Sequence, residues 1–373
     1  MREHYLLDES VIFLNHGSFG ACPKPVFEQY QAWQLELERQ PVEFLGRRHD
    51  TLIRDALAQL GDFLGTSGDN LVFVPNATTG LNMVVRSLKL SAEDEILTTE
   101  HEYGALNLTW QYISQQTDCQ VKAMPLPNYL SDAEAVADSI WQGVTKHTKI
   151  LFLSHITSPT ALILPVEILC QRAREAGIIT IIDGAHAPGH LKLDLDSLGV
   201  DFYSGNCHKW LSAPKGSAFT YIRPEHHALI DPLTISWGWD GDTLFERTRW
   251  QGTREIASFL TVPTAIDFHK EHDWWTLSEQ CHQLAIATGE RISHMTKLQP
   301  LATDDFFAQM IAIPLPNDTD IVHLKNYLYD QHRIEVPLTS HAERKFVRVS
   351  IQAYNTQSDV DMLVNAIEAY YAD

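Results

Sequence analysis

The stretch IITIIDGAHAPGHLKLDLDSLGVDFYSGNCHKW (residues 178–210) contains two apolar runs typical of buried strands, each followed by a reactive side chain. The first run, 178–183, ends on Asp183, and the second, 200–204, is soon followed by Lys209. A carboxylate at the end of a buried strand needs a partner because burying an unpaired charge is costly. Asp183 alone is compatible with a helix cap or a salt bridge, and Lys209 alone with a surface loop. Because ligands bind beyond the carboxyl ends of such strands, we expect both side chains to reach one cleft.

The surrounding chain alternates short apolar runs with helical stretches. KILFLSH (149–155) and SAFTYI (217–222) read as strands. PVEILCQRAREAG (165–177) reads as a helix, with Pro165 at its start and Gly177 past its end. This alternation predicts an α/β fold with a mostly parallel sheet covered by helices.

The pattern changes after about residue 265. A long helical stretch leads into a second set of shorter strands and helices, which cover 265–298, 307–315, 320–332, 333–338, 346–353 and a last helix from about 358. We predict a large domain over residues 15–264 and a smaller α+β domain over 1–14 and 265–373. The Trp- and Gly-rich stretch 231–255 is expected to link them.

Composition limits the function classes. The 373 residues carry a formal net charge of −20, which would repel nucleic acid and anionic membranes. No apolar run approaches the ~18 residues of a membrane span, and the first residues lack an apolar signal core, so a cytoplasmic protein is expected. Five scattered cysteines without a CxxC pair support neither a disulfide framework nor a zinc site. The expected partners are a small molecule and a second copy of the chain, with no metal.

An acid and a lysine in one cleft fit pyridoxal 5′-phosphate (PLP), which needs a lysine for its Schiff base and a carboxylate at its pyridine nitrogen. A phosphate cradle is expected where a strand, 71–75, is followed by NATTG (76–80) as a turn and by a helix from 81. Free N–H groups at a helix N-terminus and the hydroxyls of Thr78 and Thr79 bind anions well. Alone, this signal is weak, because Asn and Thr are ordinary capping residues.

Four longer motifs carry a resemblance, DGAHAPGH (183–190), GNCHKWLSAPKG (205–216), WQGTRE (250–255) and RVSIQAYNT (348–356). Together they resemble the class-V aminotransferase family of PLP enzymes, which has fold type I. LNHGSFG (14–20), with the pairs GNxHKW and QGTR, is similar to the isopenicillin N epimerase branch of that family. The resemblance covers nearly the whole chain.

The resemblance implies cofactor-binding roles. Lys209 would form the Schiff base and move the Cα proton, Asp183 would hold the pyridine nitrogen, and His186 would lie near the 3′-oxygen. The phosphate would be bound by Ala77, Thr78, Tyr203 and His208, and by Thr253 from the neighbouring subunit of a homodimer. Tyr103, seven positions before Trp110, would stack on the ring, with His101 as the alternative.

The resemblance also implies substrate contacts. Arg348 would grip the α-carboxylate, which suits a bidentate guanidinium. Asn15 and His16 are expected to touch the substrate, although a plain glycine turn is an equal interpretation there. Three further arginines would either bind a second carboxylate or line a dimer interface, and the sequence does not decide between these two roles. They are Arg47, Arg48 and Arg254.

Several reactions share the base Lys209: epimerisation, C–S lysis and transamination. Residues 333–348 lack the cysteine nucleophile of a desulfurase, which argues against that activity. Epimerisation usually needs a second acid/base, for which the candidates are Tyr103, His101, His16 and His341. We favour an isopenicillin N epimerase-like activity on an amino acid, through an external aldimine. A C–S (β-elimination) lyase or an aminotransferase is the alternative, and the catalytic set argues against a non-enzymatic binding module.

Overall fold

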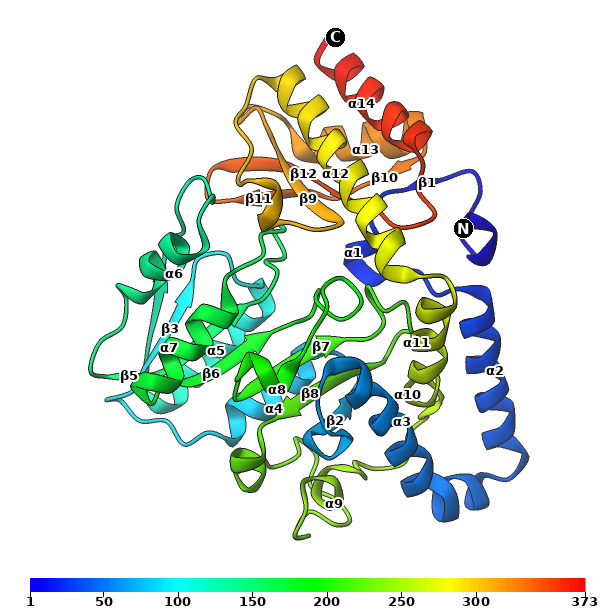
Figure 1. Cartoon of the computed structure of the whole chain (residues 1–373), viewed down its shortest axis with the longest axis vertical. Helices are drawn as coiled ribbons and strands as arrows, with labels where there is room; N and C mark the ends of the chain where they lie inside the picture. The colour runs from blue at the N-terminus through cyan, green and yellow to red at the C-terminus, as the bar shows by residue number, and fades with distance from the viewer. Residues whose placement is uncertain (373) are drawn as a thin grey trace.

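Seven strands form the large sheet of the computed structural model, which describes residues 1–372 (Figure 1). In their spatial order they are β2 (Leu71–Val74), β8 (Ala218–Ile222), β7 (Phe202–Asn206), β6 (Ile179–Asp183), β5 (Thr148–Ser154), β3 (Glu95–Thr99) and β4 (Gln120–Met124). The five strands from β7 to β4 run parallel, and β8 is antiparallel to both of its neighbours. The predicted α/β class with a mostly parallel sheet is confirmed.

The register of the central strands brings their carboxyl ends into one row. Asp183, the last residue of β6, pairs with Ser154 of β5 on one side and Ser204 of β7 on the other. The residues of β6 and β7 are almost all buried because helices cover both faces of the sheet. Polar groups that follow these strands therefore emerge side by side at one edge.

Helices α4 (Ala77–Ser87) and α5 (Gly104–Thr117) cover one face, where they share an apolar core with the side chains of Ile96 and Ile181. The other face packs against the remaining larger helices, which are α2 (Lys24–Arg39), α3 (His49–Leu64), α6 (Ala133–Trp141), α7 (Val166–Ala176) and α11 (Val262–Glu271). Shorter elements complete this part, namely α1 (His16–Phe19), α8 (Leu195–Leu198), α9 (Leu244–Thr248), α10 (Ala257–Leu260), a π-helical turn at Glu43–Arg48 and 3₁₀ turns at Arg2–His4, Gly68–Asn70 and Pro224–Leu229.

The predicted helix at 165–177 is confirmed, whereas the predicted turn at 76–80 is not. Helix α7 begins and ends within one residue of the predicted bounds, and Gly177 caps it with φ 70°. The stretch 76–80 is not a separate turn, because α4 already begins at Ala77. Asn76 caps this helix, accepting a hydrogen bond from the N–H of Thr79 at 2.8 Å.

A second, smaller sheet belongs to the C-terminal part of the chain, at the top of Figure 1. Strands β11 (Leu338–His341), β12 (Arg344–Ser350) and β9 (Met310–Leu315) are antiparallel in that order, while β1 (Ile12–Phe13) pairs with β10 (Ile334–Glu335). With α12 (Trp274–Thr296), α13 (Ile321–His332) and α14 (Gln357–Ala372) they enclose a separate apolar core that includes Leu14. A 3₁₀ turn, Asp304–Phe306, precedes β9. The domain boundaries given above stay a prediction.

The connection between the two parts differs from the expected one. Leu244 and Phe245 are buried in the cores of the large sheet, so the stretch 231–255 is not the link. Instead α11 and α12 run from one part to the other (Figure 1), and the helical stretch 265–298 is broken at Asp273, where φ is 47°. Within residues 1–372, no helix is both long and apolar enough to cross a membrane.

Candidate active site

A polar cavity of about 670 Å³ lies beyond the carboxyl ends of β5, β6 and β7. The structure brings nine of the sequence-predicted site residues to its wall, namely Ala77, Thr78, Thr79, Tyr103, Asp183, His186, His208, Lys209 and Arg348. Further lining residues that the sequence did not single out are Ser18, Phe19, Ser154, Ser158 and Asn206. Asp183 and Lys209 thus open onto the same cavity, as expected from their places after successive strands.

Lys209 presents a buried amine to this cavity. Its Nζ lies 3.1 Å from Nε2 of His186, whose Nδ1 accepts a hydrogen bond from the indole N–H of Trp210. That arrangement leaves the imidazole proton on Nε2, from which it is donated to the lysine. Burial, followed by the nearby charge of Arg348, lowers the pKa of Lys209 to about 7. A neutral amine, as a nucleophile or a base requires, is therefore available near pH 7.

Asp183 is a buried carboxylate with one open oxygen. Its Oδ1 accepts a hydrogen bond from the N–H of Ala185 at 2.9 Å, whereas Oδ2 accepts none from residues 1–372. Burial raises the pKa of Asp183, and the charge of Lys209 opposes the rise. The free oxygen of Asp183 could accept a hydrogen bond from a cationic N–H group in the cavity. A protonated pyridine offers such a group.

The N-terminus of α4 provides the anion-binding end of the cavity. The N–H of Ala77 donates to Oδ1 of Asn206 at 2.8 Å, and the side chain of Thr78 faces the same space. His208 lies opposite, with Nδ1 hydrogen-bonded to the carbonyl of Ser217 at 2.9 Å, and burial lowers its pKa to about 4. The N–H groups of Ala77 and Thr79 are thus occupied, so the groups that fit a phosphate here are Thr78, at the helix N-terminus, and the side-chain NH₂ of Asn206.

Side-chain alternation along β7 explains why Asn206 lies in the cavity and Tyr203 does not. Residues 202, 204 and 206 point to the face covered by α4, and residue 203 points to the opposite face. Tyr203 is fully buried there, and its hydroxyl lies 2.8 Å from Nδ1 of His155. The predicted phosphate contact of Tyr203 is therefore not seen, and the period of a strand is the signal that would have selected Asn206.

Arg348 is held in place at the small-sheet side of the cavity. Its Nη1 donates to the carbonyl of Ser158 at 2.6 Å, and Nη2 donates to Oγ of Ser18 at 3.1 Å. Its buried Nε has no hydrogen-bond partner among the described residues. Because this guanidinium lines the polar cavity and no carboxylate of residues 1–372 pairs with it, it fits a carboxylate ligand.

Asn15 and His16 do not line the cavity, so the expected substrate contact is not seen for either. Asn15 accepts a hydrogen bond from Ser18 and donates one to Glu335 at 3.0 Å. It therefore acts on Arg348 only through Ser18. The ring of His16 is fully buried, and Nε2 lies 2.9 Å from the carbonyl of Lys209. Burial lowers the pKa of His16 to about 3, which keeps it neutral.

The remaining sequence candidates lie outside the cavity. Thr253 is exposed and does not reach the cavity of its own chain. Arg48 forms an ion pair with Glu36 at 2.6 Å, and Arg47 is exposed. Arg254 packs over the ring of Phe259. No carboxylate-binding role is visible for these arginines within one chain (Arg47, Arg48 and Arg254).

An adjoining cavity of about 390 Å³ shares Tyr103, Ser158 and Arg348 with the main one. His341 lines only this second cavity. His101 lines neither cavity, because its ring packs on that of His341 at 3.8 Å and Nδ1 lies 2.8 Å from Oγ1 of Thr160. Tyr103 therefore lies on the cavity wall and His101 does not, and the stacking role stays a prediction.

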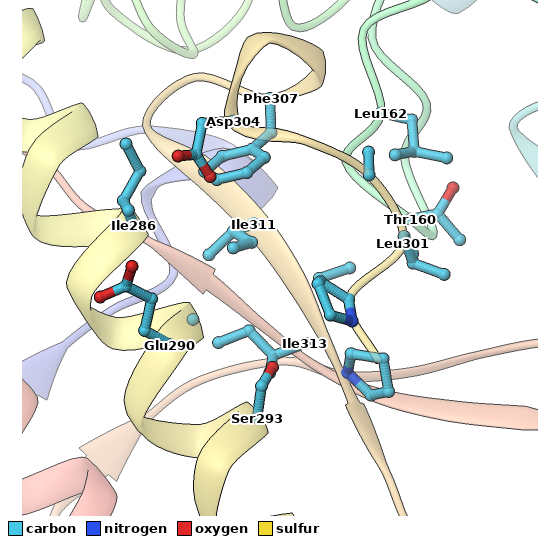
Figure 2. Close-up of a pocket in the computed structure, with 15 residues that line it drawn as sticks. Thr160, Leu162, Ile286, Glu290, Ser293, Leu301, Asp304, Phe307, Ile311 and Ile313 are labelled. Carbon is cyan, nitrogen blue, oxygen red and sulfur yellow. The ribbon is translucent and has the colours of Figure 1, made fainter. Parts of the chain in front are cut away.

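A third cavity, of about 280 Å³, differs in chemistry (Figure 2). Ile286 of α12, Ile311 and Ile313 of β9, and Phe307 line it, and Leu162 and Leu301 close it from the large-sheet side. Its polar atoms come chiefly from Glu290, Ser293, Asp304 and Thr160 (Figure 2). This mainly apolar cavity contains neither Lys209 nor Asp183 nor Arg348, so the polar cavity that holds all three is the candidate active site.

Comparisons with known proteins identify the family of the chain. The sequence model of the family Aminotransferase class-V matches residues 21–363. Isopenicillin N epimerases of Amycolatopsis lactamdurans and Streptomyces clavuligerus are 34% and 31% identical, with 98% and 99% of this chain and 97% of each relative covered. A probable chloroplastic L-cysteine desulfhydrase of Arabidopsis thaliana is 25% identical over 96% of this chain and 83% of its own length.

Solved structures show the same fold. The apo cysteine desulfurase of Thermococcus onnurineus NA1 has a TM-score of 0.85 and 22% identity, with 99% of this chain and 96% of that chain covered. A variant of C-DES with glycine covalently linked to its PLP cofactor also has a TM-score of 0.85, with 20% identity over 99% of each chain. The open oxygen of Asp183, the neutral amine of Lys209 and the α4 N-terminus fit that cofactor. The chain is a member of the class-V aminotransferase family, a PLP-dependent enzyme of fold type I.

Proposed function

We propose that the chain is an amino acid epimerase similar to the isopenicillin N epimerases, which inverts Cα of a substrate with a free α-carboxylate. The observation that carries the proposal is that the amine of Lys209 and the guanidinium of Arg348 line the same cavity. A base beside a carboxylate clamp is what abstraction of a Cα proton requires. The similarity to two epimerases along nearly the whole chain favours inversion over the other reactions of the family.

Each residue of the cavity has a separate task in this proposal. PLP, when bound, would withdraw electrons from Cα and so acidify its proton. Asp183 would keep the positive charge on the pyridine nitrogen, because its open oxygen faces the cavity. Arg348 would fix the α-carboxylate and thereby aim the Cα–H bond. Lys209 would take the proton from Cα and return one.

The placement of the thiols argues against a persulfide-forming desulfurase. None of the five cysteines lines the polar cavity, and burial raises the pKa of Cys22, Cys170 and Cys281 to about 12. The hairpin from β11 to β12 turns over only two residues, Ala342 and Glu343, so it offers no loop to deliver a thiolate. A mechanism that needs a cysteine nucleophile lacks it here.

A C–S lyase is the second candidate. It is favoured by the L-cysteine desulfhydrase relative, whose similarity extends over 96% of this chain. β-Elimination uses the same base, clamp and cofactor, and differs only in the loss of a Cβ substituent. Lys209 and Arg348 are common to both activities, which are therefore distinguished by their products.

A panel of L- and D-amino acids in deuterated water tests the proposal. The expected result is deuterium at Cα together with loss of optical purity for at least one substrate, measured by mass spectrometry after chiral separation. Release of pyruvate and ammonia from cysteine without inversion of any substrate would instead establish the lyase. The Lys209→Ala variant is the matched control and should show neither reaction.

A further inference from the structure

Inversion at Cα needs proton delivery on the face opposite to the base. Lys209 supplies only one face, so an epimerase of this fold needs a second acid. The sequence left four candidates, Tyr103, His101, His16 and His341. The order of the strands and the two adjoining cavities separate them.

The sheet order places Tyr103 and Lys209 on opposite sides of Asp183. Along the carboxyl edge, Lys209 follows β7, Asp183 ends β6, Ser154 ends β5 and Tyr103 follows β3, in that spatial sequence. All four line the same cavity. A planar ring held by Asp183 would therefore have Lys209 on its β7 side and Tyr103 on its β3 side.

Tyr103 also lies next to the carboxylate clamp. It lines both the main cavity and the adjoining one, and Arg348 and Ser158 line both cavities too. Since Cα is bonded to the α-carboxylate, a side chain that borders both spaces lies where Cα must be held. The Tyr103 side chain is 45% exposed, and its hydroxyl makes no hydrogen bond to residues 1–372, so the proton is free for exchange.

The three histidine candidates are placed less well than Tyr103 to deliver a proton to Cα. His16 is buried behind Lys209 and uses Nε2 on its carbonyl, so it does not border either cavity. His101 uses Nδ1 on Thr160 and packs behind His341. His341 borders only the adjoining cavity and is separated from the anchoring group Asp183 by the Tyr103 and Arg348 wall.

We propose that Tyr103 is the second catalytic acid/base of the epimerisation, an inference that rests on the proposed function. In one direction Lys209 takes the Cα proton as its neutral amine becomes ammonium, and the Tyr103 O–H bond breaks as its proton is delivered to the other face of Cα. Water then takes the proton from Lys209 and returns one to the Tyr103 phenolate. The reverse direction exchanges the two roles, and no oxidant or reductant is consumed.

The test uses the PLP-loaded enzyme and its Tyr103→Phe variant with each enantiomer in deuterated water. Phe keeps a ring over the cofactor but removes the hydroxyl. Inversion should fall by at least ~100-fold, the scale of a lost general acid. The enantiomer whose Cα–H faces Lys209 should still gain deuterium with retention, and its mirror image should not. A merely structural role would slow both enantiomers alike.

Control variants make the outcomes distinct. Tyr112→Phe removes a hydroxyl from an exposed tyrosine of α5, the helix that Tyr103 precedes, away from the cavity, and should leave inversion unchanged. Inversion by Tyr103→Phe at the wild-type rate would overturn the inference while the proposed function stands, and loss of inversion in His341→Asn alone would assign the role to that histidine. A wild-type enzyme that inverts no amino acid would overturn both.

Discussion

At the scale of single residues, the site depends on groups whose charges differ from their ordinary values in water. Burial lowers the pKa of Lys209 to about 7 and raises that of Asp183. These are opposite changes with one cause, since a low-dielectric site disfavours the charged form of either group. The pair therefore needs a ligand that supplies a positive charge to the acid and an electrophile to the amine.

The pH dependence of cofactor capture follows from the Lys209 amine. Its protonated form is not a nucleophile, and the neutral fraction rises as pH increases through about 7. The rate at which cofactor-free enzyme turns yellow with PLP should rise about tenfold per pH unit below 7 and level off above it. Stopped-flow absorbance measures this rate. An ordinary lysine side chain in a free peptide is the control and should keep accelerating to about pH 10. A profile for the enzyme that follows the peptide would contradict the low pKa.

Arg348→Lys tests the carboxylate clamp. Lysine keeps the charge but loses the planar fork that binds a carboxylate through two hydrogen bonds. We expect KM for amino acids to rise about 100-fold, which corresponds to about 2.7 kcal/mol of substrate binding. Arg291→Lys, in a surface ion pair with Asp361, is the matched control and should leave KM unchanged. An unchanged KM in Arg348→Lys would show that the carboxylate binds elsewhere.

At the scale of elements, the segment before α2 packs against the backbone that carries Lys209. Gly20 has φ 72° and ψ 162°, a region that only glycine readily occupies, and a Cβ there would lie 2.0 Å from the carbonyl oxygen of His208. The β7–β8 connection is thus held from behind by an N-terminal residue. Loss of that packing would move the Lys209 amine within the site without altering its chemical identity.

Two glycine variants test how strictly position 20 requires glycine, because Gly20 differs from Gly177 both in its backbone region and in its contact with His208. Gly177→Ala places a side chain at φ 70° with nothing within 4 Å of its Cβ, and should cost about 1 kcal/mol. Gly20→Ala adds the clash with His208 and should cost more than ~3 kcal/mol and weaken PLP binding. Urea unfolding and titration with PLP measure the two effects. Equal losses in both variants would show that the contact does not matter.

The elements also show what a single sequence can predict. The strands of the large sheet and helix α7 follow from apolar runs and capping residues, because these signals are local. The structure places Tyr203 away from the cavity, and alternation within β7 is the pattern that separates it from Asn206. The position of His16 under Lys209 joins residues 193 apart, and no local pattern encodes such a contact. The break at Asp273 follows from backbone geometry that helical periodicity does not report.

At the scale of the whole molecule, we propose that two chains share their active sites. Thr253 is exposed and lies outside the cavity of its own chain, although its motif belongs to the family pattern. A phosphate contact by Thr253 then has to come from a second chain. The proposal needs a test that distinguishes a direct contribution of Thr253 to the partner's active site from an indirect effect of Thr253 on its own chain.

Complementation provides that test. Lys209→Ala removes the base of one site, and Thr253→Asp would place a negative charge against the phosphate of the partner site. Each variant alone should be inactive. Refolded together at equal amounts, they should recover about a quarter of wild-type activity, because half of random dimers are mixed and each contains one intact site. Analytical ultracentrifugation should show the dimer, and no recovery would place Thr253 within its own chain's site.

The distribution of sulfur has a practical consequence. Four of the five thiols are buried and the fifth, Cys22, is only partly accessible. Alkylating reagents should therefore react slowly with the native protein and leave it active. A cysteine introduced on α14 and another on α7 would then carry spin labels against a nearly silent background, so that rocking of the smaller part over the substrate could be followed without first replacing native residues.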